Sequence, residues 1–238
     1  MTLQEIHAQR VWARLAGGCF LAAIIVAIAA RIVLARIAGH GSFAASTARM
    51  AASEHAYRAG LAGSLLVTLS SVLLAFSLYA TLKPVHNLLA QFGLVFNLCD
   101  SVLAFVVRMC SFVDLHLHLA ASSANAEALS DLVQTIAAAT ENLGGICFGA
   151  GSILFFWLFL RSRYIPVALA ILGVAASVLW TLLYFAMLIF PERSGLFRTI
   201  CFPPMLLSEL AAGVYLLIFA VKHGQPVDPV PPLPSGNA

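Results

Sequence analysis

A chain of 238 residues in which 61% are hydrophobic and only 10% are charged cannot build the surface of a water-soluble domain, where roughly 45–50% and 25% are usual. Lipid is therefore expected to cover most of its outside. The net charge of +3 comes from 13 scattered lysines and arginines without a basic stripe, which argues against nucleic acid as a partner.

Six apolar runs are long enough to span a bilayer, whose hydrocarbon core of about 30 Å takes about 20 helical residues. The first run exceeds the apolar region of a signal peptide, so we expect it to stay as a helix. The sequence predicts an all-α fold: a polytopic membrane protein, built as a six-transmembrane-helix bundle in one domain over residues 1–222. The runs cover residues 13–34, 59–82, 87–109, 140–160, 165–189 and 202–221.

The connections between these runs differ in length and polarity. Short joints with Pro84 and Pro166 precede the third and fifth runs, and Pro203 with Pro204 is expected at the start of the sixth. The longer connections, 35–58 and 110–130, are expected to fold over an outward-facing opening. Residues 223–238 are rich in proline and lack apolar periodicity, which predicts a disordered tail.

The orientation follows from the lysines and arginines in short loops, which favour the cytoplasmic side. More of them lie on the side of the two termini than on the other, where acids accompany Arg36, Arg49, Arg193 and Arg198. Both termini are therefore expected in the cytoplasm. The residues on their side are Arg10, Arg14, Lys83, Arg161, Arg163 and Lys222.

Several short motifs carry a family resemblance. They are Arg58-Ala59-Gly60, Tyr79-Ala80-Thr81-Leu82-Lys83-Pro84-Val85, Phe148-Gly149 and Arg161-Ser162-Arg163-Tyr164-Ile165-Pro166. From about Ala13 to Lys222 the chain resembles a bacterial membrane family, domain of unknown function 4386. The resemblance implies a small polytopic protein of the bacterial cytoplasmic (inner) membrane, and it supplies no reaction and no cofactor.

One departure from the family pattern affects the third run. Relatives often have Phe-Arg-Leu-x-Glu where this chain reads Phe96-Asn97-Leu98-Cys99-Asp100. An Arg/Glu pair is thus replaced by Asn97 and Asp100, so a charge-pair role common to the family is not carried over.

Two acids, Asp100 and Glu209, lie deep within spanning runs, where an ionisable side chain costs about 2.5–3.5 kcal/mol and normally faces the protein interior. Counted from cytoplasmic ends near Asn87 and Lys222, each lies 13 residues along its helix, or about 20 Å at 1.5 Å per residue, so they share a depth. Asn97 and Arg108 fall on the same helical face as Asp100. Two carboxyls at one depth are able to share a proton, which suits an acid or base in lipid-soluble chemistry.

A second polar group is expected near the outer boundary. Arg58 heads the second run, Arg108 ends the third, and Glu141 with Asn142 begins the fourth. We therefore expect a polar cavity open to the outside, with the deep acids at its floor and this group at its mouth; the alternative is that an arginine pairs with Glu141 merely to fasten helices. The candidate ligand-binding residues are Arg58, Asn97, Asp100, Arg108, Glu141, Asn142, Tyr184 and Glu209.

Other patterns are better explained by structure than by chemistry. In Asp114-x-His116-x-His118 only Asp114 and His118 share a helix face, and no third ligand stands at a known spacing, so we expect no metal site. No cofactor-binding motif appears in the sequence. The glycines at 144, 145, 149 and 151 indicate close helix contact, with a substrate groove as the second interpretation.

Three functional interpretations remain open at this point. The first is binding of a small amphipathic or lipid-like ligand in the outward cavity, with arginines attracting an anionic group. The second is a membrane-embedded enzyme of the isomerase, cyclase or hydrolase type, with Asp100 or Glu209 as acid or base. The third is a structural or interaction protein without a ligand, in which the polar side chains are fully paired. No pattern indicates a particular oligomeric state.

Overall fold

Helices make up almost all of the part of the chain that the structure describes, as expected where lipid leaves every backbone N–H and C=O to be paired within its own segment. A computed structural model describes residues 3–39, 42–120 and 125–221; the predicted tail at 223–238 lies outside the described residues. The described elements are α1 (Leu3–Ala38), α2 (Phe43–Ala52), α3 (Glu54–Leu82), α4 (Asn87–Leu119), α5 (Ala126–Ser162), α6 (Val167–Ile189), a 3-10 turn η1 (Pro191–Arg193) and α7 (Ser194–Phe219).

Six of these helices, all but α2, are long and apolar enough to cross a membrane. Their outward surface fits that environment, because large apolar side chains such as Ile25, Leu66 and Leu182 are 67%, 58% and 62% exposed. The chain is therefore a multi-pass membrane protein with an all-α fold, and the six-helix prediction is confirmed.

The long connections expected at 35–58 and 110–130 are corrected by the structure. The first contains α2, and most of the second belongs to α4 and α5. A helix of 33 residues such as α4 measures about 50 Å, well beyond a hydrocarbon core of about 30 Å, so it continues past the lipid. Pro203 and Pro204 likewise lie inside α7, which begins earlier, at Ser194.

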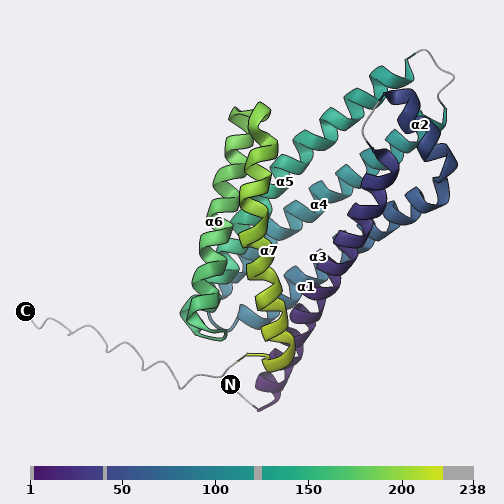
Figure 1. Ribbon diagram of the computed structural model, residues 1–238. Helices are drawn as coiled ribbons and strands as arrows, with labels where there is room; N and C mark the ends of the chain where they lie inside the picture. The colour runs from purple at the N-terminus through teal and green to yellow at the C-terminus, as the bar shows by residue number, and fades with distance from the viewer. Residues whose placement is uncertain (1–2, 40–41, 121–124, 222–238) are drawn as a thin grey trace, which may run out of the picture.

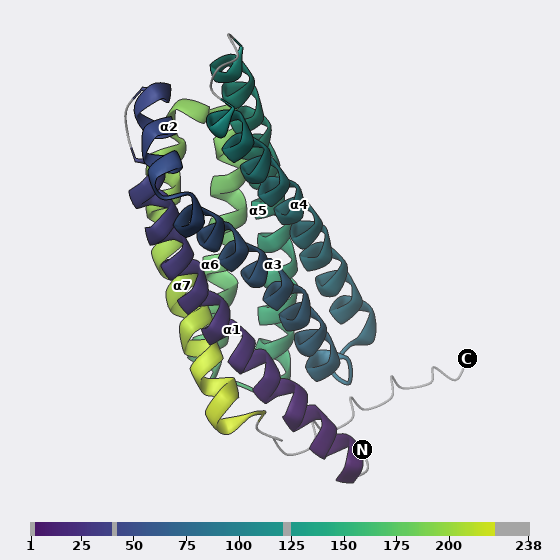
Figure 2. The same ribbon diagram turned by 90° about the vertical axis from the view of Figure 1, so that its right-hand side faces the viewer.

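The six spanning helices form a closed ring in which each contacts its neighbours in the order α1, α3, α4, α5, α6, α7 and back to α1. Figure 1 shows the ring from the side and Figure 2 from a perpendicular direction. We call the end with residues 3 and 221 the proximal end, and the end with α2 the distal end. Arg49 fastens α2 there by donating to the carbonyls of Ile37 and Ala38, at 3.1 and 2.7 Å.

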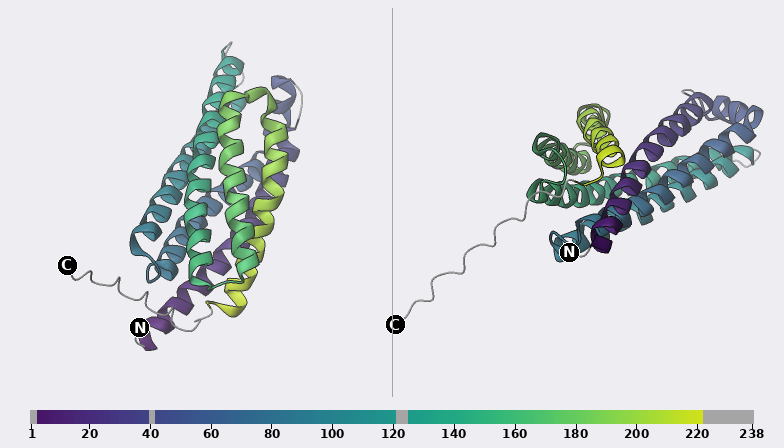
Figure 3. Two further views of the ribbon diagram at one scale, coloured as in Figure 1. Left: turned by 90° about the vertical axis from the view of Figure 1, so that its left-hand side faces the viewer. Right: turned by 90° about the horizontal axis from the view of Figure 1, so that it is seen from below.

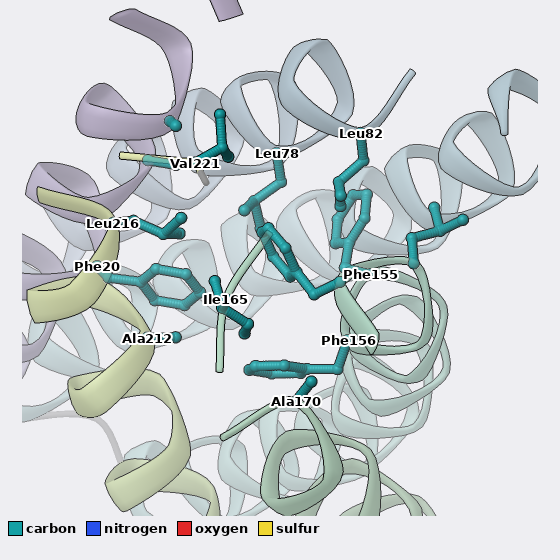
Figure 4. Packing of buried hydrophobic residues seen from close by; sticks show 14 of the residues in the cluster. Phe20, Leu78, Leu82, Phe155, Phe156, Ile165, Ala170, Ala212, Leu216 and Val221 are labelled. Carbon is teal, nitrogen blue, oxygen red and sulfur yellow. The ribbon is translucent and has the colours of Figure 1, made fainter. Parts of the chain in front are cut away.

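An apolar core closes the proximal end of the bundle. Figure 4 shows its side chains converging from α1, α3, α5 and α7, with Phe20, Leu78, Phe155 and Leu216 among them. Each is at most 7% exposed. Because such close packing leaves little free space, any large opening must lie toward the distal end.

Helix α1 meets α7 only within this proximal half. A Cβ on Gly17 would collide with backbone atoms of Gly213 and Leu217, so the two helices touch backbone to backbone at this point. Toward the distal end the helices separate: in Figure 1 purple α1 leans away from yellow-green α7, and the view from below in Figure 3 shows the same separation. The divergence produces a wedge-shaped interior.

Candidate functional site

A cavity of about 800 Å³ occupies this wedge and is lined by all six spanning helices. That volume lies within the usual range of ligand sites, roughly 300–1,000 Å³. Most of its wall is apolar, including Phe20, Ile24 and Ala27 of α1 together with Met205 and Leu206 of α7. The charged side chains that line it fall into two groups at different depths.

The cavity is open on the side where α1 and α7 diverge. Ile28 of α1 and Phe202 of α7 both line it, and they are 46% and 44% exposed. We expect this open side to face lipid, because both side chains belong to spanning helices.

The deeper group, which we call the acidic tier, consists of Asp100 on α4 and Glu209 on α7. Both line the cavity and lie within electrostatic range of each other. Within the described part of the chain neither carboxyl has a hydrogen-bond or ion-pair partner. Asp100 also packs against α5, because residue 144 is glycine: a Cβ there would lie 3.0 Å from its Oδ1.

The shallower group, which we call the basic tier, consists of Arg31, Arg108 and Arg198 together with Glu141. Arg198 forms an ion pair with Glu141 at 3.1 Å. Arg108 lies within electrostatic range of Glu141 and Arg31, but its buried Nε has no hydrogen-bond partner among the described residues. Three positive charges thus face one negative charge.

A rigid aromatic wall joins the two tiers on the α6 side. Trp180 and Tyr184 stack with ring centroids 4.8 Å apart, and the indole Nε1 of Trp180 donates to the carbonyl of Gly145 at 3.0 Å. The Tyr184 ring lies directly over Gly145, so close that a Cβ there would overlap it. The glycines of α5 therefore serve helix contact, while Gly144 and Gly145 also line the cavity.

The family model for a domain of unknown function, DUF4386, matches residues 15–220, which is most of the chain. The chain belongs to this family. No curated protein and no solved structure matches it. For this DUF4386 protein, functional inference therefore rests on the geometry of its own cavity.

Five of the residues singled out from the sequence of this DUF4386 protein line the one cavity: Asp100, Arg108, Glu141, Tyr184 and Glu209. Two others stand beside it. Asn142 accepts a hydrogen bond from Arg198 at 3.3 Å. Asn97 lines a small void of about 20 Å³ together with Glu209, and its amide donates to the carbonyl of Gly93 at 3.0 Å.

Arg58 occupies a different place from the one expected. Instead of standing at the mouth of the cavity, it pairs with Glu54 one turn earlier on α3, at 2.7 Å, and it is not among the cavity-lining residues. The expectation failed because a shared depth says nothing about the direction in which a side chain points. Of the polar group predicted at the mouth of the cavity, only Arg108 and Glu141 line it.

Sequence reasoning missed Arg31 and Arg198 as members of the site. Arg31 carries a usable signal, because an arginine inside a spanning run normally faces the protein interior or a polar cavity. Arg198 was assigned to a loop, whereas the structure places it on the second turn of α7. A prediction that started this helix earlier would have placed Arg198 and Glu209 on the same helix.

A separate polar cluster lies at the distal end of the DUF4386 bundle, away from the cavity lining. Asp114 accepts from Ser130 at 2.5 Å and lies 3.9 Å from His118, which stacks on Phe43 and bonds Thr47 at 2.8 Å. These contacts tie α2 and α5 to α4. No group of three metal-ligating side chains occurs within the described residues.

Proposed function

We propose that this protein binds a small amphipathic or lipid-like molecule in the cavity, with the anionic group of the ligand at Arg31 and Arg108. The protein would act in the cytoplasmic membrane of a bacterium with both termini in the cytoplasm, so that the cavity opens in the outer half of the bilayer. The observation that carries the proposal is one 800 Å³ cavity with a largely apolar wall and an excess of arginine at one end.

The charge balance of the basic tier supports an anionic ligand group. Arg198 is already paired with Glu141, whereas the Nε of Arg108 lacks a partner within the described chain. A buried guanidinium N–H without a hydrogen-bond partner is costly, and a carboxylate or phosphate accepts from several such groups at once. Glu141 alone does not balance the three arginines of the basic tier, which favours an anionic ligand group there.

The open side between α1 and α7 supports a ligand that exchanges with the bilayer. An acyl chain could pass Ile28 and Phe202 without leaving an apolar environment, and its charged group would remain at the level of the arginines. Long amphipathic side chains at a membrane interface behave in the same way, with the apolar stem in hydrocarbon and the charged end in water. A purely water-soluble ligand has no use for this apolar passage.

A second candidate function is a membrane-embedded enzyme that uses Asp100 or Glu209 as acid or base. The observation in its favour is two unpaired carboxyls within electrostatic range of each other on the wall of an apolar cavity. A purely structural role is less consistent with these side chains, because helix fastening would leave them paired.

Fluorescence of Trp180 offers a test of ligand binding at the cavity itself. The variant Trp12→Phe/Trp157→Phe leaves Trp180 as the one tryptophan of the three in the chain. In nanodiscs of neutral lipid, brominated dodecanoate should quench Trp180 in a saturable manner, because bromine quenches indole only near contact. Arg108→Gln should weaken the binding about tenfold through loss of a charge-assisted contact.

The matched control is Trp180→Phe, which keeps Trp12 and Trp157 on the lipid-facing surface, where they are 39% and 49% exposed. Their quenching should rise steadily with the amphiphile dissolved in the bilayer, without saturation. Saturable quenching in both proteins, or in neither, would contradict binding in this cavity.

A further inference from the structure

We propose that the ligand is bipolar: an anionic end bound by the basic tier and an amine end bound by Asp100 and Glu209, joined by an apolar segment. This inference rests on the proposed function and specifies the chemical class of its ligand. It comes from the arrangement of opposite charges along the axis of the cavity.

Two antiparallel helices place the tiers in the same order. On α4, Arg108 follows Asp100 by eight residues, which is about 12 Å at 1.5 Å per residue. On α7, Glu209 follows Arg198 by eleven residues, or about 16 Å. Because α4 runs from proximal to distal and α7 runs back, both helices put the acid proximal and the arginine distal.

No ion pair to the acidic tier occurs among the described residues. Asp100 and Glu209 are within electrostatic range of each other, and their nearest positive side chains on α4 and α7 stand a full tier away. Two carboxyls facing one apolar cavity are stabilised by a positive group between them, since charge pairing gains strength where water is excluded. An ammonium supplies one positive charge and three donors.

The α4 and α7 residues that line the cavity between the tiers are largely apolar. They include Ala104 and Val107 on α4 and Met205 and Leu206 on α7, and Ala27 of α1 lines the same cavity. Such a lining fits a hydrocarbon linker. A simple anionic lipid would instead lay its chain against the two carboxyls and leave them unsatisfied.

The class that satisfies both tiers is an alkyl chain with a carboxylate or phosphate at one end and a primary amine at the other. In an extended conformation a twelve-carbon ω-amino acid is of about the length that separates the tiers on α4 and α7. A headgroup that carries both charges side by side would reach only one tier.

Competition at Trp180 tests the inference. In the protein with Trp180 as its one tryptophan, 12-aminododecanoate should displace brominated dodecanoate at about one tenth of the concentration that unlabelled dodecanoate needs, because it adds a charge-assisted contact at the acidic tier. The six-carbon and sixteen-carbon amino acids should compete less well than the twelve-carbon one. The amphiphiles partition into the bilayer to different extents. Each concentration is therefore expressed as the amount of amphiphile that nanodiscs without protein take up under the same conditions.

The variant Asp100→Asn/Glu209→Gln is the matched comparison, since it keeps the size of both side chains and removes their charge. In this variant the two amphiphiles should compete equally, and Asp100→Asn alone should give an intermediate preference if the double variant does not fold. Two results overturn the bipolar ligand: equal competition in the protein with both carboxyls intact, or a preference for the amino acid that persists in the double variant. Neither result contradicts the binding of dodecanoate itself. Failure of every amphiphile to act at Trp180 overturns the proposed function itself.

Discussion

Tyr184 owes its place on the cavity wall to the missing side chain of Gly145. The ring rests on the α5 backbone and stacks against Trp180, so the two aromatic side chains and the glycine act as one unit. Glycine in a helix normally costs about 1 kcal/mol relative to alanine, and here that cost is offset by close helix contact.

Gly145→Ala should therefore destabilise the protein by about 1–3 kcal/mol, because the added methyl forces the Tyr184 ring off its position. The same change should weaken saturable quenching of Trp180 by brominated dodecanoate. Thermal unfolding in detergent measures the first effect. Gly195→Ala is the control, since nothing lies within 4 Å of a Cβ there; an equal loss of stability in both variants would contradict the assigned contact.

The two arginines at 58 and 108 were expected to act together, and the structure separates them. Arg58 is held by Glu54 on its own helix, in a half-exposed pair of a kind worth about 0.3–0.5 kcal/mol, whereas Arg108 lines the cavity. We expect Arg58→Gln to leave amphiphile binding within twofold of the original and Arg108→Gln to weaken it about tenfold. Quenching titrations of Trp180 compare them directly, and a larger loss from Arg58→Gln would return that residue to the site.

At the scale of the helix, the sequence predicted how many elements there are better than where they end. Hydropathy marks the part of a helix that touches lipid, and the number of spanning runs follows from it. A helix can extend beyond the lipid, because its backbone hydrogen bonds are made within the helix itself. Helices α4 and α5 therefore include most of the polar residues that suggested a loop at 110–130. The two prolines of α7 do not mark the start of that helix, because packing against neighbouring helices allows proline inside a spanning helix.

The contact of α1 with α7 determines how these two helices diverge, and the cavity opens between them. Gly17 meets backbone atoms of α7, which cannot move aside as a flexible side chain can, whereas at Gly18 the nearest atom to an added Cβ is 4.0 Å away. Gly17→Ala should cost about 2 kcal/mol or more and alter the cavity, while Gly18→Ala should be neutral or slightly stabilising through helix propensity. Unfolding temperatures of the two variants provide the test; equal values would mean that the helices do not touch at this point.

At the scale of the whole molecule, depth was predictable from the sequence and neighbourhood was not. Counting 1.5 Å per residue gave Asp100 and Glu209 a common depth, and both line one cavity. The order of helices around the ring depends on side-chain packing between distant segments, and no local pattern encodes it. Whether Arg31 belongs to the site depends on the packing of α1 beside α3 and α7, and only the structure gives these neighbours.

The orientation of the bundle decides which leaflet the cavity meets. Lys83 and Arg163 occupy the proximal joints and Arg10 lies near the proximal end of α1, which favours a cytoplasmic proximal end. With the five native cysteines replaced, Ala52→Cys on α2 should react with a membrane-impermeant maleimide in intact spheroplasts, and Asn87→Cys should react only after the membrane is opened. Both positions are exposed, so access alone separates them. The reverse labelling pattern would turn the open side between α1 and α7 toward the inner leaflet, and the ligand would then be drawn from cytoplasmic lipid.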